Sequence, residues 1–384
     1  MWSYLGKRLV QMIITLLLFQ VLTYLLIDAQ PGDIADLLTQ NPDIPPGEVQ
    51  RLRTDLGLNK PPLQRMVSYI GNFYVGNLGV SFQEYPKPVI DIIKERLPRT
   101  IVLFVTANMI AFWAGFVTGK ILAWRRGGLV EYGSTIAGVT LYTVFLPWFA
   151  LMMIWLFAVT LDWFPPGKFI DPLKWLAAET PATNEIFILL IWTSLIAILV
   201  AFAGFALSNR VPRKLRLPVR IASVLLPVAG VVVYWVSSGY AVLAWDIVSH
   251  LFLPVLTLTL YSYGGTMLLM RTTMLETLRE DYIMTARAKG LPDTAVRDKH
   301  AARNALLPVW TGLVFGIVLS VGGGIITETV FSWPGIGLAY LNAATSEDIP
   351  VAMGILTILG VLTLVAQLIV DIGYAFLDPR IRYS

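Results

Sequence analysis

RTTMLETLREDYIMTARAKGLPDTAVRDKHAARNALLP, residues Arg271–Pro308, is the longest strongly charged segment in the second half of an otherwise apolar chain. It carries seven Lys and Arg residues against five Asp and Glu residues. The apolar runs Leu251–Met270 and Val309–Val321 lie directly before and after it. A charged segment between two such runs predicts a loop that leaves the membrane between two transmembrane helices.

Within the charged segment the pattern is helix, break, helix. One apolar stripe on the first helix is predicted by residues that recur at three- and four-residue steps, namely Leu275, Leu278, Tyr282 and Ala286. Gly-Leu-Pro at 290–292 ends this helix, because Gly tolerates left-handed backbone and Pro cannot continue the hydrogen-bond ladder. We expect Asp293 to cap the N-terminus of a second helix that reaches Leu307.

Composition indicates an integral membrane protein. Of the 384 residues 56% are hydrophobic and only 14% are charged, whereas soluble domains carry about 25% charged residues. Long unbroken apolar runs favour a helix bundle over a barrel, because each run satisfies its own backbone hydrogen bonds in lipid. The chain has no cysteine, which excludes disulfides and cysteine metal sites. Its net charge of +4 is modest, and we do not interpret it as a nucleic-acid signal.

Eight transmembrane segments are expected. They are Leu9–Ile27, Thr100–Ala123, Ser134–Leu161, Ile186–Leu207, Ile221–Val236, Ser249–Met270, Pro308–Thr327 and Pro350–Tyr374. No small-residue cleavage site follows the first run, so we interpret it as a retained helix and not as a signal peptide. With the N-terminus inside, 19 of the 29 Lys and Arg residues are cytoplasmic. The sequence therefore predicts a multi-pass protein of the cell membrane with both termini in the cytoplasm.

The charged segment resembles a known docking loop. DYIMTARAKGL at 281–291, followed by RNALLPV at 303–309, resembles the EAA loop of ABC-transporter permeases in its dipeptide/oligopeptide (DppB/OppB-type) form. The general frame Glu-Ala-Ala-x-x-x-Gly is matched only at its last Ala, by Ala286, and at its Gly, by Gly290. We attribute this departure to the peptide-type subfamily. The alternative is an ordinary charged loop between two spans.

Two further stretches resemble the same family. ETVFSWPGIG at 328–337 follows three glycines at 322–324, which predict close helix packing or a broken helix. DIGYAFLDPRIRY at 371–383 closes the chain. The family usually has six spans. The sequence similarity to the family is interrupted at about 172–245, so we interpret this stretch as an inserted hairpin of two spans. The expected organisation is a stub and first helix at 1–27, an extracytoplasmic segment at 28–96, a permease domain at 97–375 with the hairpin 172–245 and the docking loop 271–308, and a cytoplasmic tail at 376–384.

The resemblance implies an all-α membrane protein with the type I ABC importer transmembrane fold and about eight helices. It also implies a second homologous permease, two cytoplasmic ABC ATPases and an extracytoplasmic solute-binding protein as partners, beside membrane lipid. No cofactor is expected on this chain, and ATP and Mg would be bound by the ATPases. The residues that would dock on an ATPase are Asp281, Tyr282, Thr285, Ala286, Arg287, Ala288, Lys289, Gly290 and Leu291.

Three residues after the seventh span are candidates for the pathway or its outer gate, namely Glu328, Phe331 and Trp333. A solvated interfacial carboxylate is the alternative for Glu328. Asp371 lies near the inner end of the last span, and we expect it to pair with a basic residue of the tail or the docking loop. Because His250 and His300 are far apart and no ligand set accompanies them, no metal site is expected.

The expected function is that of a non-catalytic permease subunit, which forms a pathway for di- or oligopeptides with a second permease. The same machine importing oligosaccharides or another small solute is the alternative. The closest text to a nucleotide-binding loop, Ala114–Ile121, lacks its first Gly and the Ser or Thr after Lys. An intramembrane enzyme would need a polar catalytic pair within the spans, and no such pair is found. A receptor or scaffold is a third possibility, which co-purification with an ATPase would exclude.

Overall fold

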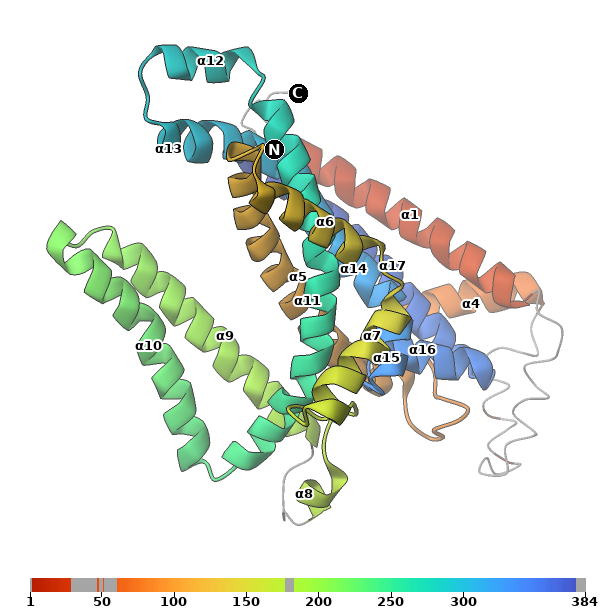
Figure 1. Cartoon of the computed structure of the whole chain (residues 1–384). Coiled ribbons are helices and arrows are strands. Elements are labelled where there is room, and N and C mark those ends of the chain that lie inside the picture. Colours follow the sequence, from red (N-terminus) through yellow and green to blue (C-terminus); the bar gives the residue numbers. More distant parts are fainter. Residues whose placement is uncertain (1, 29–46, 48–50, 52–60, 177–182, 378–384) are drawn as a thin grey trace. The chain divides into compact units, whose positions relative to one another are not determined.

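The computed structural model describes residues 2–28, 47, 51, 61–176 and 183–377. In this part of the chain all regular secondary structure is helical apart from one isolated bridge between Val80 and Pro88, which confirms the all-α prediction (Figure 1). Most of the expected extracytoplasmic segment and of the cytoplasmic tail lies outside the described residues. The helices are α1 Trp2–Asp28, α4 Pro62–Tyr74, α5 Val89–Trp124, α6 Leu129–Thr143, α7 Leu146–Ile154, π-helix η1 Trp155–Thr160, α8 Pro172–Leu176, α9 Thr183–Ser208, α10 Arg213–Ser237, α11 Ala241–Thr277, α12 Asp281–Ala288, α13 Asp293–Ala295, π-helix η2 Val296–Ala301, α14 Ala302–Gly323, α15 Ile325–Val330, α16 Ile336–Thr345 and α17 Ile349–Leu377.

Six helical stretches among the described residues are long and apolar enough to cross a membrane. They are Val89–Trp124, Thr183–Ser208, Lys214–Ser237, Ala241–Thr277, Asp293–Val318 and Ile349–Gly373. The first expected span corresponds to α1, whose apolar section Val10–Leu25 is shorter. Two helices begin earlier than the apolar runs of the sequence predict, namely α5 at Val89 and α11 at Ala241. A helix can continue past the bilayer into polar surroundings.

The third expected span is not one straight helix. It is divided into α6 and the stretch Leu146–Thr160, which are bent by 103° relative to each other. Pro147 explains the position of the break, because a proline ring clashes with the carbonyl group four residues earlier, and α6 ends at Thr143. If the bent pair counts as one span, the described residues contain seven.

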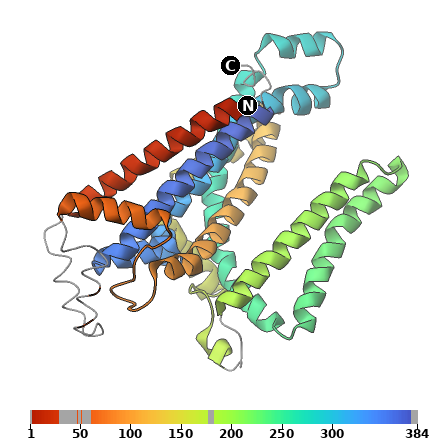
Figure 2. The ribbon, with the colours of Figure 1, turned by 180° about the vertical axis from the view of Figure 1, so that it is seen from behind.

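The chain forms two compact units, residues 1–151 with 255–384 and residues 152–254. In the larger unit α14 packs on both α5 and α17, and α1 lies along α17 in both views (Figures 1 and 2). The core at one end of this unit joins Leu78, Val89 and Ile93 to Ile336 and Ile355. The expected broken helix is found after the glycines, since α14 ends at Gly323 and α15 begins at Ile325.

Close packing of α5 on α11 depends on two glycines one turn apart. A Cβ atom on Gly119 would lie 2.6 Å from the backbone oxygen of Met267, and one on Gly115 would lie 2.9 Å from the nitrogen of the same residue. Such distances leave no room for a side chain, so small residues let the two backbones meet as they do in other membrane helix pairs. The stretch Ala114–Ile121, whose sequence partly resembles a nucleotide-binding loop, therefore belongs to a helix–helix contact.

In the smaller unit α9 and α10 form the hairpin expected at 172–245, and Gly204 lies against Ser223 between them. Asp246 is the polar centre of this unit, with a fully buried side chain. It accepts hydrogen bonds from the backbone nitrogen of Asp171 at 2.9 Å, from Lys174 Nζ at 2.8 Å and from Trp175 Nε1 at 3.0 Å. These bonds hold the α8 segment against the start of α11.

Candidate functional site

The expected docking loop protrudes as a bracket of short helices, which we define as residues 278–301 (Figure 1). The single apolar stripe predicted for it is wrong, because α11 ends at Thr277 and α12 begins only at Asp281. Gly290 has a φ of +69° and ends the first arm of the bracket as predicted. The N-cap of α13 is Pro292, so Asp293 is the first residue of the helix and not its cap as expected. The helix that follows continues from the bracket through η2 and α14 to Gly323 instead of ending at Leu307.

Burial divides the bracket into an inner and an outer face. Ile283 and Ala286 are 0% and 4% exposed and pack in a cluster with Met270, Met274 and Val296. The outer face includes the exposed residues Asp281, Tyr282, Met284, Thr285, Arg287, Ala288, Lys289, Gly290 and Leu291. Ala286 is thus turned away from the surface on which it was expected, because its side chain completes the core that supports the bracket.

Polar contacts fasten both arms of the bracket to neighbouring helices. Asn304 Nδ2 donates to the hydroxyl of Tyr282 at 2.7 Å, and the guanidinium of Arg287 lies 5.5 Å from the centre of the Trp124 ring. Lys120 Nζ of α5 lies 3.0 Å from the carboxylate of Asp298. A displacement of α12 would therefore be transmitted to α5 and α14.

Another ion pair stands at the base of the bracket. Arg271 Nε of α11 donates to Glu131 Oε1 of α6 at 3.1 Å, and Glu131 is only 5% exposed. Sequence reasoning missed this pair and the Lys120–Asp298 pair. Each joins residues far apart in the chain, and the available signal was the position of Lys120 and Glu131 within or beside apolar runs.

Glu328 is fully buried, so the solvated carboxylate considered for it is wrong. Thr100 Oγ1 of α5 donates to Glu328 Oε1 at 2.6 Å, and the backbone nitrogen of Leu338 donates to Oε2 at 2.8 Å. The carboxylate thereby holds the start of α16 against α5. Burial raises the pKa of Glu328 to about 7, although the hydrogen bonds from Thr100, Leu338 and Gly337 act to lower it. Glu328 lies in α15, outside the candidate spans.

Phe331 and Trp333 are also fully buried. They belong to the turn between α15 and α16, in which Trp333 Nε1 donates to the backbone oxygen of Arg99 at 3.2 Å. Between α16 and α17, Asp348, 3% exposed, accepts hydrogen bonds from the backbone nitrogens of Phe82 at 3.1 Å and Gln83 at 3.2 Å. The expected gate residues thus form a packed, hydrogen-bonded turn within this chain.

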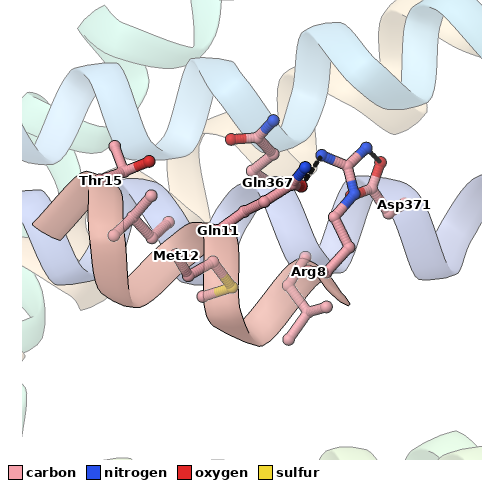
Figure 3. A pocket seen from close by; sticks show the side chains of 8 residues that line it. Arg8, Gln11, Met12, Thr15, Gln367 and Asp371 are labelled. Carbon is pink, nitrogen blue, oxygen red and sulfur yellow. Dashed lines mark hydrogen bonds and ion pairs between the residues drawn. The ribbon is translucent and has the colours of Figure 1, made fainter. Parts of the chain in front are cut away.

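The expected partner of Asp371 is a basic residue of the tail or of the docking loop, and the basic residues of the tail lie outside the described residues. Among the described residues its carboxylate pairs with the guanidinium of Arg8 of α1, Nε to Oδ2 at 3.1 Å (Figure 3). The chain brings α1 back along α17, which local sequence does not reveal. His250 Nδ1 lies 3.7 Å from Asp246 Oδ1, an acidic neighbour that sequence reasoning overlooked, but no group of three or more potential metal ligands occurs among the described residues.

Comparison with known proteins identifies the class of transporter. The family of binding-protein-dependent transport system inner membrane components matches residues 195–383, and the N-terminal family of such membrane components matches residues 1–104. The di/tripeptide transport system permease protein DppB of Pseudomonas aeruginosa is 32% identical over 100% of both chains. The oligopeptide transport system permease protein AppB of Bacillus subtilis is 30% identical, also over 100% of both. The chain therefore belongs to the family of binding-protein-dependent ABC importer permeases of the dipeptide/oligopeptide type, whose members are non-catalytic membrane subunits.

Proposed function

We propose that this chain forms, with a second homologous permease, the membrane pathway for di- and oligopeptides that an extracytoplasmic solute-binding protein delivers. The relatives named as peptide permeases support peptides as the solute. Two cytoplasmic ATPases, which bind ATP and Mg, would power the cycle. In this arrangement residues 1–27 and 97–375 form the membrane part, residues 28–96 and 172–245 are an outer segment and an added hairpin, and the bracket and both termini face the cytoplasm.

The observation that carries the proposal is the two-sided construction of the bracket. Its outer face offers charged and apolar side chains, among them Tyr282, Arg287, Lys289 and Leu291, for contact with an ATPase. Its inner face is buried on the ends of α5, α11 and α14. A closing motion of the ATPases would push the outer face, and the packed inner face would pass that motion to the spans, as alternating access requires.

This cycle also needs an outer gate. We place it at the turn between α15 and α16, with Phe331 and Trp333 in the turn and Glu328 in the helix directly before it. Because these side chains are buried in this chain, their part would be to keep the turn rigid while neighbouring surfaces meet the second permease or the binding protein. Solute specificity would then belong to the binding protein, because the sequence of the expected spans is apolar and weakly charged and offers little to hold both termini of a peptide.

Cysteine cross-linking tests the docking assignment, since the chain has no native cysteine. A cysteine at Met284, which is 58% exposed, should cross-link to a co-purified ATPase. A cysteine at exposed Ser346, after α16, is the matched control and should not. Cross-linking at Ser346 but not at Met284 would overturn the assignment. Labelling by an impermeant reagent outside intact cells should reach a cysteine at Lys168 and not one at Arg210.

A separate measurement tests the solute. Calorimetry on the purified permease pair should detect no tight binding of peptides or oligosaccharides until the binding protein is added. Tight binding by the pair alone would refute the division of labour. Uptake of an oligosaccharide without uptake of peptides by the assembled transporter would refute the peptide assignment and leave the docking assignment intact.

A further inference from the structure

The turn between α9 and α10, with the first two helical turns of α10, carries a cluster of positive charge (Figure 1). We call residues 209–220 the basic tip. Five of its twelve residues are Lys or Arg and none is Asp or Glu. The basic residues are Arg210, Arg213, Lys214, Arg216 and Arg220. None of them has a part in the function proposed above, so the inference depends neither on the solute nor on the ATPase contact.

The charge of the basic tip is not neutralised within the hairpin. Between residues 183 and 246 the sequence has only two acidic residues, Glu185 and Asp246. Each is separated from the tip by the length of a helix, about 35 Å at a rise of roughly 1.5 Å per residue. This separation is several times the Debye length of roughly 10 Å in dilute salt. The tip therefore keeps a positive potential that can attract an anion.

Two guanidinium groups of the tip are held in place by neutral acceptors. Arg216 Nε donates to the backbone oxygen of Val211 at 3.1 Å. Arg220 Nε donates to Ser208 Oγ at 3.1 Å, and its Nη2 donates to Asn209 Oδ1 at 3.0 Å. None of these acceptors is ionised, so the bonds fix the turn without cancelling its charge.

Exposed apolar side chains adjoin the charges. Arg210 and Lys214 are exposed, and the neighbouring Leu207, Leu215 and Leu217 are each more than half exposed. The two helices that meet at the tip are long and apolar enough to cross a membrane, and only 11% of the apolar part of each is buried. A turn between two such helices lies at a membrane boundary, where phosphate groups are within reach of cations and acyl chains are within reach of leucines.

The exposure around the hairpin favours lipid over a protein as the occupant. Ile198, Leu199 and Val200 are consecutive, so their side chains leave α9 in directions about 100° apart, and all three are more than half exposed. A protein partner would cover one side of such a helix, whereas lipid surrounds it. Helix α9 is thus an element that meets hydrocarbon on most of its circumference.

Charge then selects the headgroup. A zwitterionic headgroup brings its own cation to the basic tip, whereas an anionic one brings only negative charge, and basic clusters at the ends of membrane helices attract anionic lipids for this reason. We propose that the basic tip binds anionic phospholipid, with Arg210 and Lys214 on the headgroup phosphate and the neighbouring leucines on the acyl chains. The inserted hairpin would thereby be held at a fixed depth in the membrane.

Photolabelling tests the proposal on the full chain, reconstituted in nanodiscs with the subunits that accompany it. Phosphatidylglycerol and phosphatidylcholine with the same photoreactive acyl chain are the two probes, and mass spectrometry locates the labelled residues. Labelling of residues 202–220 by phosphatidylglycerol should exceed labelling by phosphatidylcholine. At about fivefold for each cation near the surface, Arg210→Gln with Lys214→Gln should lower this ratio by up to about 30-fold.

A matched variant separates position from net charge. Arg125→Gln with Arg126→Gln also removes two exposed cations, at the end of α5, and should leave the ratio at the tip unchanged. The Arg210 and Lys214 variant keeps Arg216 and Arg220, whose bonds hold the turn, and should assemble like the wild type. If it does not, salt decides on the wild type, where high ionic strength should lower the ratio without changing phosphatidylcholine labelling.

Three results would overturn the proposal. The first is a wild-type ratio of about one, or an unchanged ratio in the Arg210 and Lys214 variant. The second is competition by inorganic phosphate as effective as that by unlabelled phosphatidylglycerol, which would indicate a site for free anions. The third is efficient cross-linking of a cysteine at Leu217 to another subunit, which would show that a protein covers the tip.

Discussion

The bracket at 278–301 is held to the larger unit by apolar side chains, whereas the turn at 331–337 is held by a buried carboxylate. In the bracket, Ile283 and Ala286 fill a hydrocarbon cluster, and the charges lie on the outer face or at the rim. At the turn, Glu328 is fully buried and accepts hydrogen bonds from the hydroxyl of Thr100 and from the backbone nitrogen of Leu338.

This difference shows how each end can respond to force. Apolar packing has no directional preference, so the bracket is a rigid block whose outer face remains free to change without loss of support. Hydrogen bonds to a buried carboxylate are directional and strong in a low-dielectric environment, so the turn is defined by a few atoms. Loss of one hydrogen-bonding atom should therefore disturb only the turn itself. A substitution in the apolar core should disturb the whole bracket.

The largest effect is expected from a charge placed on the inner face of the bracket. Ala286→Glu buries an unpaired carboxylate and should destabilise the protein by about 4 kcal/mol. Ala288→Glu makes the same change on the outer face and should alter stability by no more than about 0.5 kcal/mol. Thermal unfolding in detergent measures both. Equal losses in the two variants would mean that the bracket has no inner face.

The next largest effect is a pH dependence located in the turn. Between its ordinary pKa of 4.5 and its raised pKa of about 7, Glu328 binds more proton in the folded than in the unfolded state, so stability should fall as pH rises through this window. At 1.36 kcal/mol per unit the fall is at most about 3 kcal/mol. Melting temperatures from pH 5 to 8 measure it. In Glu328→Gln this component should vanish, and an identical slope in wild type and variant would assign the dependence to another group.

A smaller effect is expected at Asp348, which lies between α16 and α17. Asp348→Asn removes the charge from a group that accepts from the backbone nitrogens of Phe82 and Gln83, and should cost about 2 kcal/mol. Asp91→Asn changes an exposed carboxylate at the start of α5 and is the control. Proteolysis of the 78–88 loop should accelerate only in the first variant. If it accelerates equally in both, Asp348 does not hold the loop.

The smallest effect is expected at the rim of the bracket. Lys120→Met removes the ion pair with Asp298, whose side chain is 39% exposed, so solvent screening limits the loss of stability to less than about 1 kcal/mol. ATP hydrolysis by the assembled transporter should respond to transported solute less strongly, because one link between α5 and the bracket is gone. A stability loss as large as that of Ala286→Glu would contradict the division between core and rim.

The sequence alone determined most of the architecture. Six of the eight expected apolar runs correspond to helices among the described residues that are long and apolar enough to cross a membrane, because each transmembrane helix satisfies its backbone within its own residues. The first expected span has a shorter apolar section, and the third is bent by 103°. The break at Gly290 and the hairpin of α9 and α10 were predictable for the same reason, since both depend on local backbone preference and hydropathy. The docking residues of 281–291 came from a motif within one short segment, and their role remains a proposal.

Only the tertiary structure decided which polar groups meet. The carboxylate of Asp371 pairs with the guanidinium of Arg8. The carboxylate of Glu328 accepts a hydrogen bond from Thr100, and Lys120 pairs with Asp298. Ala286 turned inward for a similar reason, because the return of α14 beside α11 created a core that the bracket covers. Each of these pairings joins positions far apart in the chain. Hydropathy places a residue at a depth in the membrane, but it cannot state which helix will stand beside it, and the partner across the helix interface determines whether a charge is paired, buried or free.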